Sequence, residues 1–592
     1  MAATIEVNKQ SVKTLLASGI EHPFVIPEYQ RPYAWNFDQV DTLFNDIWDF
    51  TETRGGSHRN ATYFLGCVVS FENASGEQEI IDGQQRITSL FLLLRAIYTK
   101  LKNGAETLES KNFIKQIREC IWRANKLTGE VDYDDILLTS RVVSNVGNDL
   151  LRNILKNGVV DKDATDNYSR NYRRFSELFD AASNDSPLMI YDFIYALLNQ
   201  AILMPISADT QDTALTIFST LNDRGMPLSD ADIFKAQIYS HTPDADKNAF
   251  IETWKELDDQ ATYAKESIQQ LFYYYMFYLR ALNGDSNSTT PGIRKYYLED
   301  KSRLFAPTLI DDLKTILNLW LAVTKRETIP GEAWSENLEI LQALDILTSY
   351  PNEYWKYPVI IYYLMHRQDD QFEVYFLRFL RKLIAVLLTR YLLAPTINAV
   401  KADILKLNVS IVNDPRPEFT FKEINESMLS GAIKSPNRNA VRMMLKMVAY
   451  QDAEQKVLLP ANWEIEHIFP QRWQSNYFVN MTDDVIKEKI EHIGNKLPFE
   501  KRLNIVAGNG YFGKKKKLYA ESKIAITKEM SSTSIQEWSL DDIAERDFHV
   551  SELLQQMITT WNSEYVQSPT PANEPTPEQL EMIRRFRENG WV

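Results

Sequence analysis

The sequence predicts an α+β protein that is predominantly helical. The first indication is composition, because only 20 Gly and 23 Pro occur among 592 residues, whereas an average chain has about 7% Gly and 5% Pro. The second is a long middle section, residues 294–447, in which apolar side chains recur at helical spacing. The third is a pair of short aromatic and β-branched runs near the N-terminus, which are typical of buried strands. We therefore expect helices to dominate, with strands at the two ends of the chain.

The composition also narrows the class of protein. A chain of 592 residues corresponds to about four domains, and 44% hydrophobic residues exclude a disordered or collagen-like chain. Cys67 and Cys120 are too few for a disulfide framework or a thiolate zinc site, which favours a reducing, cytoplasmic location. The N-terminus lacks the pattern of a signal peptide, and basic residues interrupt the most apolar stretch, 376–394, so we expect no membrane partner.

The charge restricts any nucleic-acid contact to a local patch. The net charge is −15, and such a chain repels polyanions in general. Residues 500–523 are the exception, because seven Lys or Arg residues stand there against two Glu residues. The phosphates of a nucleic acid are expected at this segment.

Residues 1–240 predict a first domain of mixed character. Its expected elements are a helix at 38–50, strands at 63–71 and 78–81, and a helix at 87–101. Residues 111–278 are expected to be mostly helical, with one strand at 201–207. A segment at 214–221 leads into a loop at 222–229, after which Ser229 or Asp230 can cap the next helix.

Residues 241–445 predict a helical linker domain, with a loop or linker at 283–292. Its aromatic clusters, 272–278 and 350–363, are either stacking platforms for bases or helix core, and we expect core. Residues 446–565 form the next predicted domain. Residues 566–592 predict a Pro-rich tether, 568–578, and a terminal helix, 579–589.

The domain at 446–565 carries the strongest chemical signal. Glu466 and Asn504 can supply oxygen ligands to a hard cation. His467, with an ordinary pKa of about 6.5, can deprotonate water near neutral pH, and a lysine can neutralise charge on a phosphate. This set fits a metal-dependent phosphodiesterase. The alternative is that Glu466–His467 is a surface pair and Lys514–Lys517 a solvated helix face.

The pattern resembles the HNH nucleases, in which a β-hairpin and a helix (the ββα-metal fold) hold one divalent ion. The matching residues are Glu466, His467, Pro470, Gln471, Asn495 and Asn504. The resemblance implies that His467 is the general base, that Glu466 and Asn504 bind Mg or Mn, and that Asn495 orients the histidine.

The same segment is similar to the C-terminal domain of GmrSD-type restriction enzymes, which implies that Asn509 and Lys515 complete the site. The basic patch then assigns Lys514, Lys516 and Lys517 to DNA binding. One departure from the family pattern is the run KLPFEKRLN after Asn495. It leaves open whether Asn504 or Asn509 is the metal ligand.

A second constellation is the sequence DGQQR at residues 82–86. It presents Asp82, Gly83, two amides (Gln84 and Gln85) and Arg86 where a strand is expected to lead into a helix. The N–H groups of a helix N-terminus and an arginine both attract phosphates, and Asp82 can hold magnesium or a water. The alternative is a turn that only caps a helix.

Three motifs, at 26–35, 82–86 and 217–235, occur in the same order as in the N-terminal domain of GmrSD-type enzymes. That domain is similar to the ParB/sulfiredoxin fold and is tied to nucleotide binding and hydrolysis. The resemblance implies nucleotide-binding roles for Arg31, Asp82, Gly83, Gln84, Gln85 and Arg86. Further candidate pocket residues are Asn222, Arg224, Asp232 and Lys235. There is no GxxxxGK[ST] sequence, so a P-loop is not expected.

Together, the resemblances imply a single-chain, nucleotide-regulated endonuclease of anti-phage defence that cuts DNA with hydroxymethylated or glucosylated cytosine. The implied cofactors are a divalent metal and a nucleoside triphosphate, and the implied partners are modified phage DNA and nucleotide. Three alternatives stay open: a phosphorothioate-responsive nicking nuclease with NTPase activity, an NTP-dependent sensor with a degenerate nuclease module, and an RNA nuclease. A homodimer is also left open.

Overall fold

The computed structural model describes residues 5–54, 61–124, 128, 130–142, 145–221, 229–422, 426–474 and 481–566. The chain forms two compact units, Met1–Glu256 and Leu257–Val592. It is α+β and predominantly helical, as the sequence predicts. Across these ranges, no helix combines the length and the apolar character that crossing a membrane requires.

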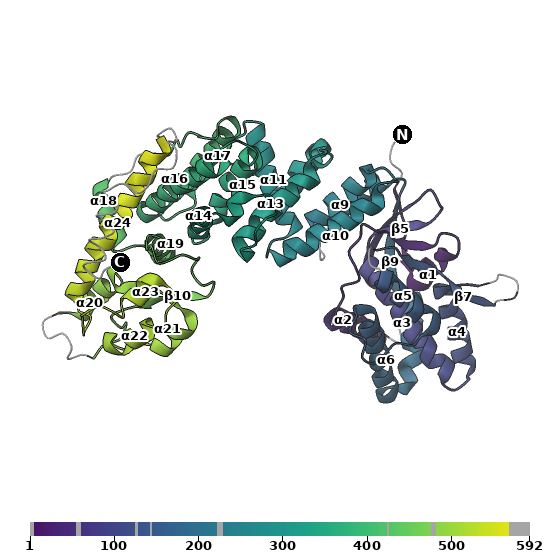
Figure 1. Ribbon diagram of the computed structural model, residues 1–592. Helices are drawn as coiled ribbons and strands as arrows, with labels where there is room; N and C mark the ends of the chain where they lie inside the picture. Colours follow the sequence, from purple (N-terminus) through teal and green to yellow (C-terminus); the bar gives the residue numbers. More distant parts are fainter. Residues whose placement is uncertain are drawn as a thin grey trace. The chain divides into compact units, whose positions relative to one another are not determined.

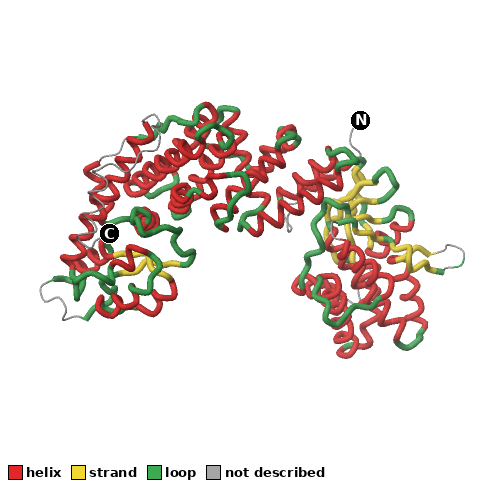
Figure 2. Tube along the Cα trace, viewed as in Figure 1, coloured by secondary structure: helices red, strands yellow, loops and turns green. Residues whose placement is uncertain are grey.

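The first unit is built on a seven-stranded mixed sheet, drawn in yellow in Figure 2, with the order β1-β9-β4-β5-β3-β8 and with β2 also paired to β9. The strands are β1 (Ile5–Val7), β2 (Gln10–Ser11), β3 (Phe24–Ile26), β4 (Tyr63–Glu72), β5 (Gln78–Asp82), β8 (Leu138–Ser140) and β9 (Ala201–Ala208). Strand β4 is parallel to β9 and antiparallel to β5. The predicted strands at 63–71, 78–81 and 201–207 are thus confirmed.

The helices of the first unit cover this sheet (Figure 1). They are α1 (Val12–Ala17), α2 (Phe37–Arg54), α3 (Gln84–Asn103), α4 (Leu108–Ile121), α5 (Asn145–Asn157), α6 (Asn167–Asp185), α7 (Ile190–Tyr195), α8 (Gln211–Leu221) and α9 (Asp230–His241). The next helix, α10 (Lys247–Tyr263), spans the boundary between the units. Ser229 is the residue that caps α9, since its side chain accepts from the Asp232 N–H.

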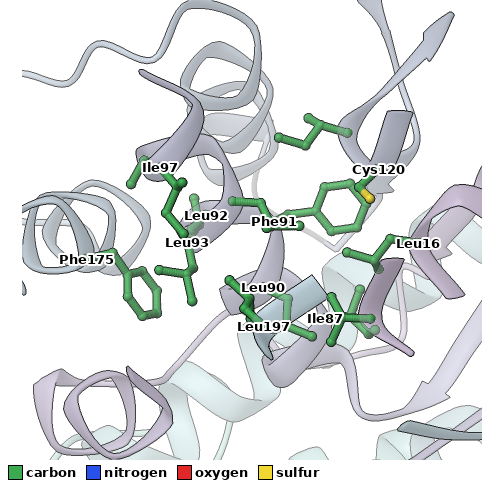
Figure 3. Packing of buried hydrophobic residues seen from close by; sticks show 14 of the residues in the cluster. Leu16, Ile87, Leu90, Phe91, Leu92, Leu93, Ile97, Cys120, Phe175 and Leu197 are labelled. Carbon is green, nitrogen blue, oxygen red and sulfur yellow. The ribbon is translucent and has the colours of Figure 1, made fainter. Parts of the chain in front are cut away.

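Helix α3 is the centre of the first core. Every residue from Gln84 to Tyr98 is buried, with the single exception of Arg86. Figure 3 shows Leu90 and Leu93 of α3 packed near Leu197 and Phe175 from distant parts of the chain. A helix that is buried on all sides has other elements packed against every face. This packing fixes the position of the first turn of α3.

The structure corrects the prediction of a single strand within residues 111–278. Strands β6 (Trp122–Ala124) and β7 (Val131–Ile136) form a separate ribbon, and β8 joins the main sheet beside β3. Strand β7 reads VDYDDI and has no fully buried residue. Because three of its six residues are acidic, its sequence lacks the apolar pattern that predicts a strand.

The second unit begins with helices. They are α11 (Ile268–Leu282), α12 (Ile293–Glu299), α13 (Leu309–Lys325), α14 (Leu338–Leu347), α15 (Lys356–His366), α16 (Phe372–Leu393), α17 (Asn398–Asn413), α18 (Glu426–Lys434) and α19 (Arg438–Ala449). The predicted loop at 283–292 joins α11 to α12. The aromatic clusters are core, as expected: Phe272, Tyr274 and Phe277 are at most 1% exposed.

The rest of the second unit is a small hairpin surrounded by helices. Its elements are β10 (Trp463–His467), α20 (Asp483–Ile490), β11 (Lys496–Glu500), α21 (Lys501–Ala507), α22 (Phe512–Tyr519), α23 (Ala525–Glu529) and α24 (Leu540–Val566). The predicted tether, terminal helix and loop residues 222–228 lie outside the described residues. The finer division at residues 240, 445 and 565 stays a prediction.

Candidate functional site

The hairpin β10–β11 places Glu466 and His467 at the end of a strand. The two strands are antiparallel, with Glu466 opposite Leu497 and His467 opposite Lys496. Alternation along a strand sends neighbouring side chains to opposite faces. Glu466 is accordingly 3% exposed, whereas the imidazole of His467 is 15% exposed. Pro470 follows the strand, as its lack of an N–H requires.

Glu466 is held in a buried polar cluster with two residues of α22. Its Oε1 lies 2.8 Å from Lys515 Nζ and accepts a hydrogen bond of 2.8 Å from the Tyr519 hydroxyl. Lys515, 1% exposed, also donates to the backbone carbonyl of His467. Burial raises the pKa of Glu466 and lowers the pKa of Lys515, while each charge opposes the shift of the other. The pair fastens α22 beneath the strand that carries His467.

The imidazole of His467 faces a carboxylate that the sequence did not identify. Glu491 Oε1 and Gln471 Nε2 each lie 3.3 Å from His467 Nε2. The other oxygen of Glu491 pairs with Lys496 Nζ at 2.9 Å. Burial lowers the pKa of His467, so the ring is neutral at neutral pH and able to accept a proton.

Asn495 acts on the chain that follows His467. Its amide nitrogen donates to the carbonyls of Phe469 and Ile490, and its amide oxygen accepts from the Phe469 N–H at 2.6 Å. Its backbone carbonyl accepts from the Ile468 N–H. Asn495 is completely buried. Its contacts are with this backbone, so any orienting effect on the imidazole passes through residues 468 and 469.

Helix α24 holds the Gly494–Asn495 turn from behind. Arg546 Nη1 donates to the carbonyls of Gly494 and Lys496 at 2.8 and 2.9 Å. Asp547 accepts from the Gly494 N–H at 2.6 Å and contacts His492 Nδ1 at 2.6 Å. A Cβ on Gly494 would lie 2.3 Å from the carbonyl oxygen of Ile543. Only glycine permits this approach.

The two later asparagines occupy different surroundings. Asn504 lies one turn into α21, which packs on both strands of the hairpin. Asn509 bonds the backbone of Arg472 with both ends of its amide, accepting from the N–H at 3.0 Å and donating to the carbonyl at 2.6 Å. Asn509 therefore ties down the loop after His467, which favours Asn504 as the oxygen donor to a metal.

The lysine run divides into three environments. Lys515 is buried in the Glu466 cluster, and Lys516 donates to the carbonyls of Thr533 and Ile535. Lys514 and Lys517 are exposed. Of the three lysines predicted to bind DNA, Lys514 and Lys517 are exposed, whereas the ammonium group of Lys516 is engaged by backbone carbonyls.

In the first unit, DGQQR lies between a strand and a helix, as predicted. Asp82 ends β5, and Gly83 adopts a left-handed conformation, φ +88°, directly before α3. A Cβ on Gly83 would also lie 3.1–3.3 Å from Val68 and the Cys67 carbonyl of β4. Glycine is therefore required by both the turn and the close packing.

The two glutamines connect DGQQR to the first motif. Gln84 donates to the side chain of Gln30 at 2.9 Å, and Gln30 donates to the Ile81 carbonyl. Gln85 accepts from the Ala34 N–H at 2.7 Å and donates to the carbonyl of Pro32. Both glutamines are buried. Their assignment to a nucleotide stays a prediction, and the structure shows that they position the loop at residues 27–35.

Asp82, Arg31 and Arg86 form a partly buried charged group. Burial raises the pKa of Asp82, and the charges of Arg86 and Arg31 oppose that rise. Arg31 Nε is buried and has no hydrogen-bond partner among the described residues. In the third motif, Asp232 accepts from Ser229 in a capping box, and Lys235 lies in α9. Asn222 and Arg224 lie outside the described residues.

Two family models match the chain over the parts that hold these sites. The model of the GmrSD restriction endonuclease N-terminal domain matches residues 12–239, and the model of the GmrSD restriction endonuclease C-terminal domain matches residues 420–550. The chain belongs to the GmrSD restriction endonuclease family. It is thus a DNA endonuclease of a restriction system. A comparison with curated proteins gives no match.

Several residues that support the GmrSD C-terminal site were missed by sequence reasoning. They are Glu491, Tyr519, Arg546 and Asp547. Glu491, Arg546 and Asp547 belong to helices whose charged residues look like solvated surface, so no local pattern marks them. Gly494 was the one available signal, because a glycine directly before the buried Asn495 indicates a close approach of another backbone.

A metal at this site would depend on few protein ligands. No group of three or more His, Cys, Asp or Glu side chains is arranged to hold an ion within the described ranges. Glu466 and Asn504 offer one carboxylate and one amide. Such a set suits Mg²⁺, which keeps several waters and takes further oxygens from a substrate phosphate.

The packing of Gly494 against α24 generates a prediction for stability. Gly494→Ala should destabilise the chain by about 1–3 kcal/mol, the usual effect of overpacking, because the backbone of α24 cannot yield as a side chain can. Thermal unfolding followed by circular dichroism measures the effect. Gly513→Ala is the control, since its Cβ would meet its nearest neighbour at an ordinary 3.7 Å. Equal melting temperatures for both variants would contradict the packing.

Proposed function

We propose that this GmrSD-family chain cuts phage DNA carrying hydroxymethylated or glucosylated cytosine at an HNH-type metal site, and that its first unit makes cutting depend on a nucleoside triphosphate. The observation that carries the nuclease proposal is the buried cluster of Glu466, Lys515 and Tyr519 beside His467. A buried ion pair is costly to maintain without its full set of bonds. Its presence argues against a degenerate module.

The proposed metal ligands are Glu466 and Asn504. Lys515 and Tyr519 both contact Oε1 of Glu466, so Oε2 is the oxygen that we assign to the ion. A bound Mg²⁺ or Mn²⁺ would stabilise negative charge on the phosphate. Lys515 contributes a fixed positive charge beside the same carboxylate.

His467 is the proposed general base. Its neutral imidazole can take a proton from the attacking water, and Glu491 stabilises the imidazolium that forms. Gln471 restricts the ring from the same side. Asn495 holds the backbone at residues 468 and 469, and Asn509 holds it at residue 472. The base is therefore held in place before the substrate binds.

DNA contact is proposed at Lys514 and Lys517, whose ammonium groups are exposed on α22. Contacts to phosphates position a protein on DNA and carry no base identity. Because the whole chain has a net charge of −15, this small patch is insufficient for tight general binding. Dependence on a modified base or on nucleotide would therefore protect unmodified host DNA.

The nucleotide proposal rests on Asp82, Arg31 and Arg86. Arg86 is the one residue of the first four turns of α3 that is not buried. Asp82 lies beside it with a carboxylate able to hold a magnesium ion or a water. Arg31 Nε, which has no hydrogen-bond partner among the residues that the structure describes, offers a further donor to a phosphate.

The nuclease proposal is tested with His467→Ala. Losing a general base should lower the rate of DNA cleavage by ~10²–10⁴, with nucleotide turnover and folding unchanged. The substrates are unmodified, hydroxymethylated, glucosylated and phosphorothioate DNA, each with Mg²⁺ or Mn²⁺, and His22→Ala is the control. Activity of His467→Ala within threefold of wild type would place the base elsewhere. Equal cutting of all four DNAs by wild type would contradict modification dependence.

The nucleotide proposal is tested with Asp82→Asn and Arg86→Gln. Each should reduce NTP turnover about tenfold or more, because a hydrogen bond to a charged group contributes ~1.5–3 kcal/mol and ~1.4 kcal/mol is a factor of ten. Lys102→Gln, at the exposed end of the same helix, is the control. Normal NTP turnover in both variants, with phage restriction lost, would show that DGQQR senses DNA instead.

A further inference from the structure

The first unit contains a pocket that Arg86 shares with α2 and β4. Its volume is about 270 Å³, and its walls include Trp35, Thr42, Phe64 and Arg86. Pockets for drug-sized ligands are commonly ~300–1,000 Å³. This pocket therefore suits one planar ring system and is too small for a whole nucleoside triphosphate.

The arginine of this pocket is fixed in place. Arg86 Nη1 donates to the Cys67 carbonyl at 3.1 Å, and the guanidinium lies over Gly66. A Cβ there would be 2.9 Å from Nη1, and φ at Gly66 is +116°. The pairing of β4 with β9 is irregular at this point, between Phe64 and Gly66. Because one edge of the guanidinium is tethered, its remaining N–H groups are oriented for a ligand.

The opposite wall is acidic. Asp38, Thr42 and Asp46 lie at four-residue intervals along α2, so they share one face of the helix. Asp46 accepts a hydrogen bond of 2.7 Å from the Tyr63 hydroxyl, which fixes its carboxylate. With two carboxylates in its lining, the pocket itself disfavours a polyphosphate, so the phosphates of a nucleotide would lie outside it. The two carboxylates are suited to accept hydrogen bonds from an amino group.

The aromatic residues supply stacking surfaces. Phe64 is 52% exposed although it belongs to a strand of the main sheet, and Trp35 is partly buried beside it in the lining. Aromatic side chains of this kind stack on bases whatever their sequence.

From this set we infer that the pocket binds a single nucleobase with an exocyclic amino group. The amino group donates to Asp38 or Asp46, a ring carbonyl or ring nitrogen accepts from Arg86, and the ring stacks on Trp35 or Phe64. Adenine, cytosine and guanine meet these requirements, whereas uracil and thymine lack the amino group. The inference rests on the proposed function, because the base comes either from the regulatory nucleotide or from DNA by base flipping.

The test uses Thr42→Phe, which fills the pocket from an exposed helix position. Asn45→Phe, on the same helix and equally exposed but outside the lining, is the matched control. One arm measures binding of AMP, CMP, GMP and UMP by calorimetry. The other measures fluorescence of duplex DNA containing one 2-aminopurine, which brightens when the base leaves the stack.

In the nucleotide arm, the best amino-bearing nucleotide should bind about tenfold tighter than UMP, the effect of one hydrogen bond to a charged group. Thr42→Phe should remove that binding, and Asn45→Phe should keep it within about twofold. A response confined to the 2-aminopurine arm, and lost in Thr42→Phe, identifies the source as DNA.

Equal binding of UMP, no response in either arm, or full binding by Thr42→Phe would overturn the inference. Cleavage of hydroxymethylated and glucosylated DNA by wild type is measured in the same preparation. Cleavage without base binding refutes only this pocket. Absence of cleavage on every DNA refutes the proposed function instead.

Discussion

The nuclease hairpin depends on the hydrogen bonds that the buried guanidinium of Arg546 donates to its turn. A charge without water needs its full set of hydrogen bonds, and losing them costs several kcal/mol. Here Nη1 donates to the carbonyls of Ile493, Gly494 and Lys496 in the turn. Burial lowers the pKa of Arg546 to about 10, so the group stays charged at neutral pH. The turn cannot move away from α24 without leaving that charge unpaired.

The consequence reaches His467, the proposed general base, in two steps. Fixing Gly494 fixes Asn495, and Asn495 holds the backbone of Ile468 and Phe469 directly after His467. Lys515 holds the carbonyl of His467 from the other side. Nearer its C-terminal end, α24 is also bonded to the helical section, because the side chain of Lys382 in α16 donates to Asn562 of α24 at 2.7 Å. One helix thus joins the hairpin to α16.

The first unit uses its motif residues in a comparable way. Gln84 and Gln85 form hydrogen bonds with the loop at 27–35, and Gly83 forms the turn before α3. Three of the five DGQQR residues therefore serve the local fold. Asp82 and Arg86 are the two that we propose to face a ligand. In both units, then, a motif supplies the residues that build the site as well as those that act in it.

The sequence predicted the elements whose pattern is strong, and it failed where the cause is tertiary. Strands β4, β5 and β9 and helix α3 follow from apolar runs and from the Gly83 turn. Strand β7 was missed because three of its six residues are acidic and none is fully buried. Glu466 and His467 were found by their motif. Glu491 and Arg546 were not, because what distinguishes them is contact with residues distant in the chain: Glu491 with His467, and Arg546 with the carbonyls of residues 493–496.

The central claim is that Glu466 and Asn504 hold a divalent ion beside His467, in a site built by α22 and α24. The most direct measurement is anomalous diffraction from crystals of the full chain grown with Mn²⁺ and a DNA duplex. We expect one Mn²⁺ peak beside the side-chain oxygens of Glu466 and Asn504, in contact with a phosphate oxygen and absent in crystals of Glu466→Gln. A peak bound by Asn509, a peak elsewhere that survives Glu466→Gln, or no peak beside His467 would contradict it.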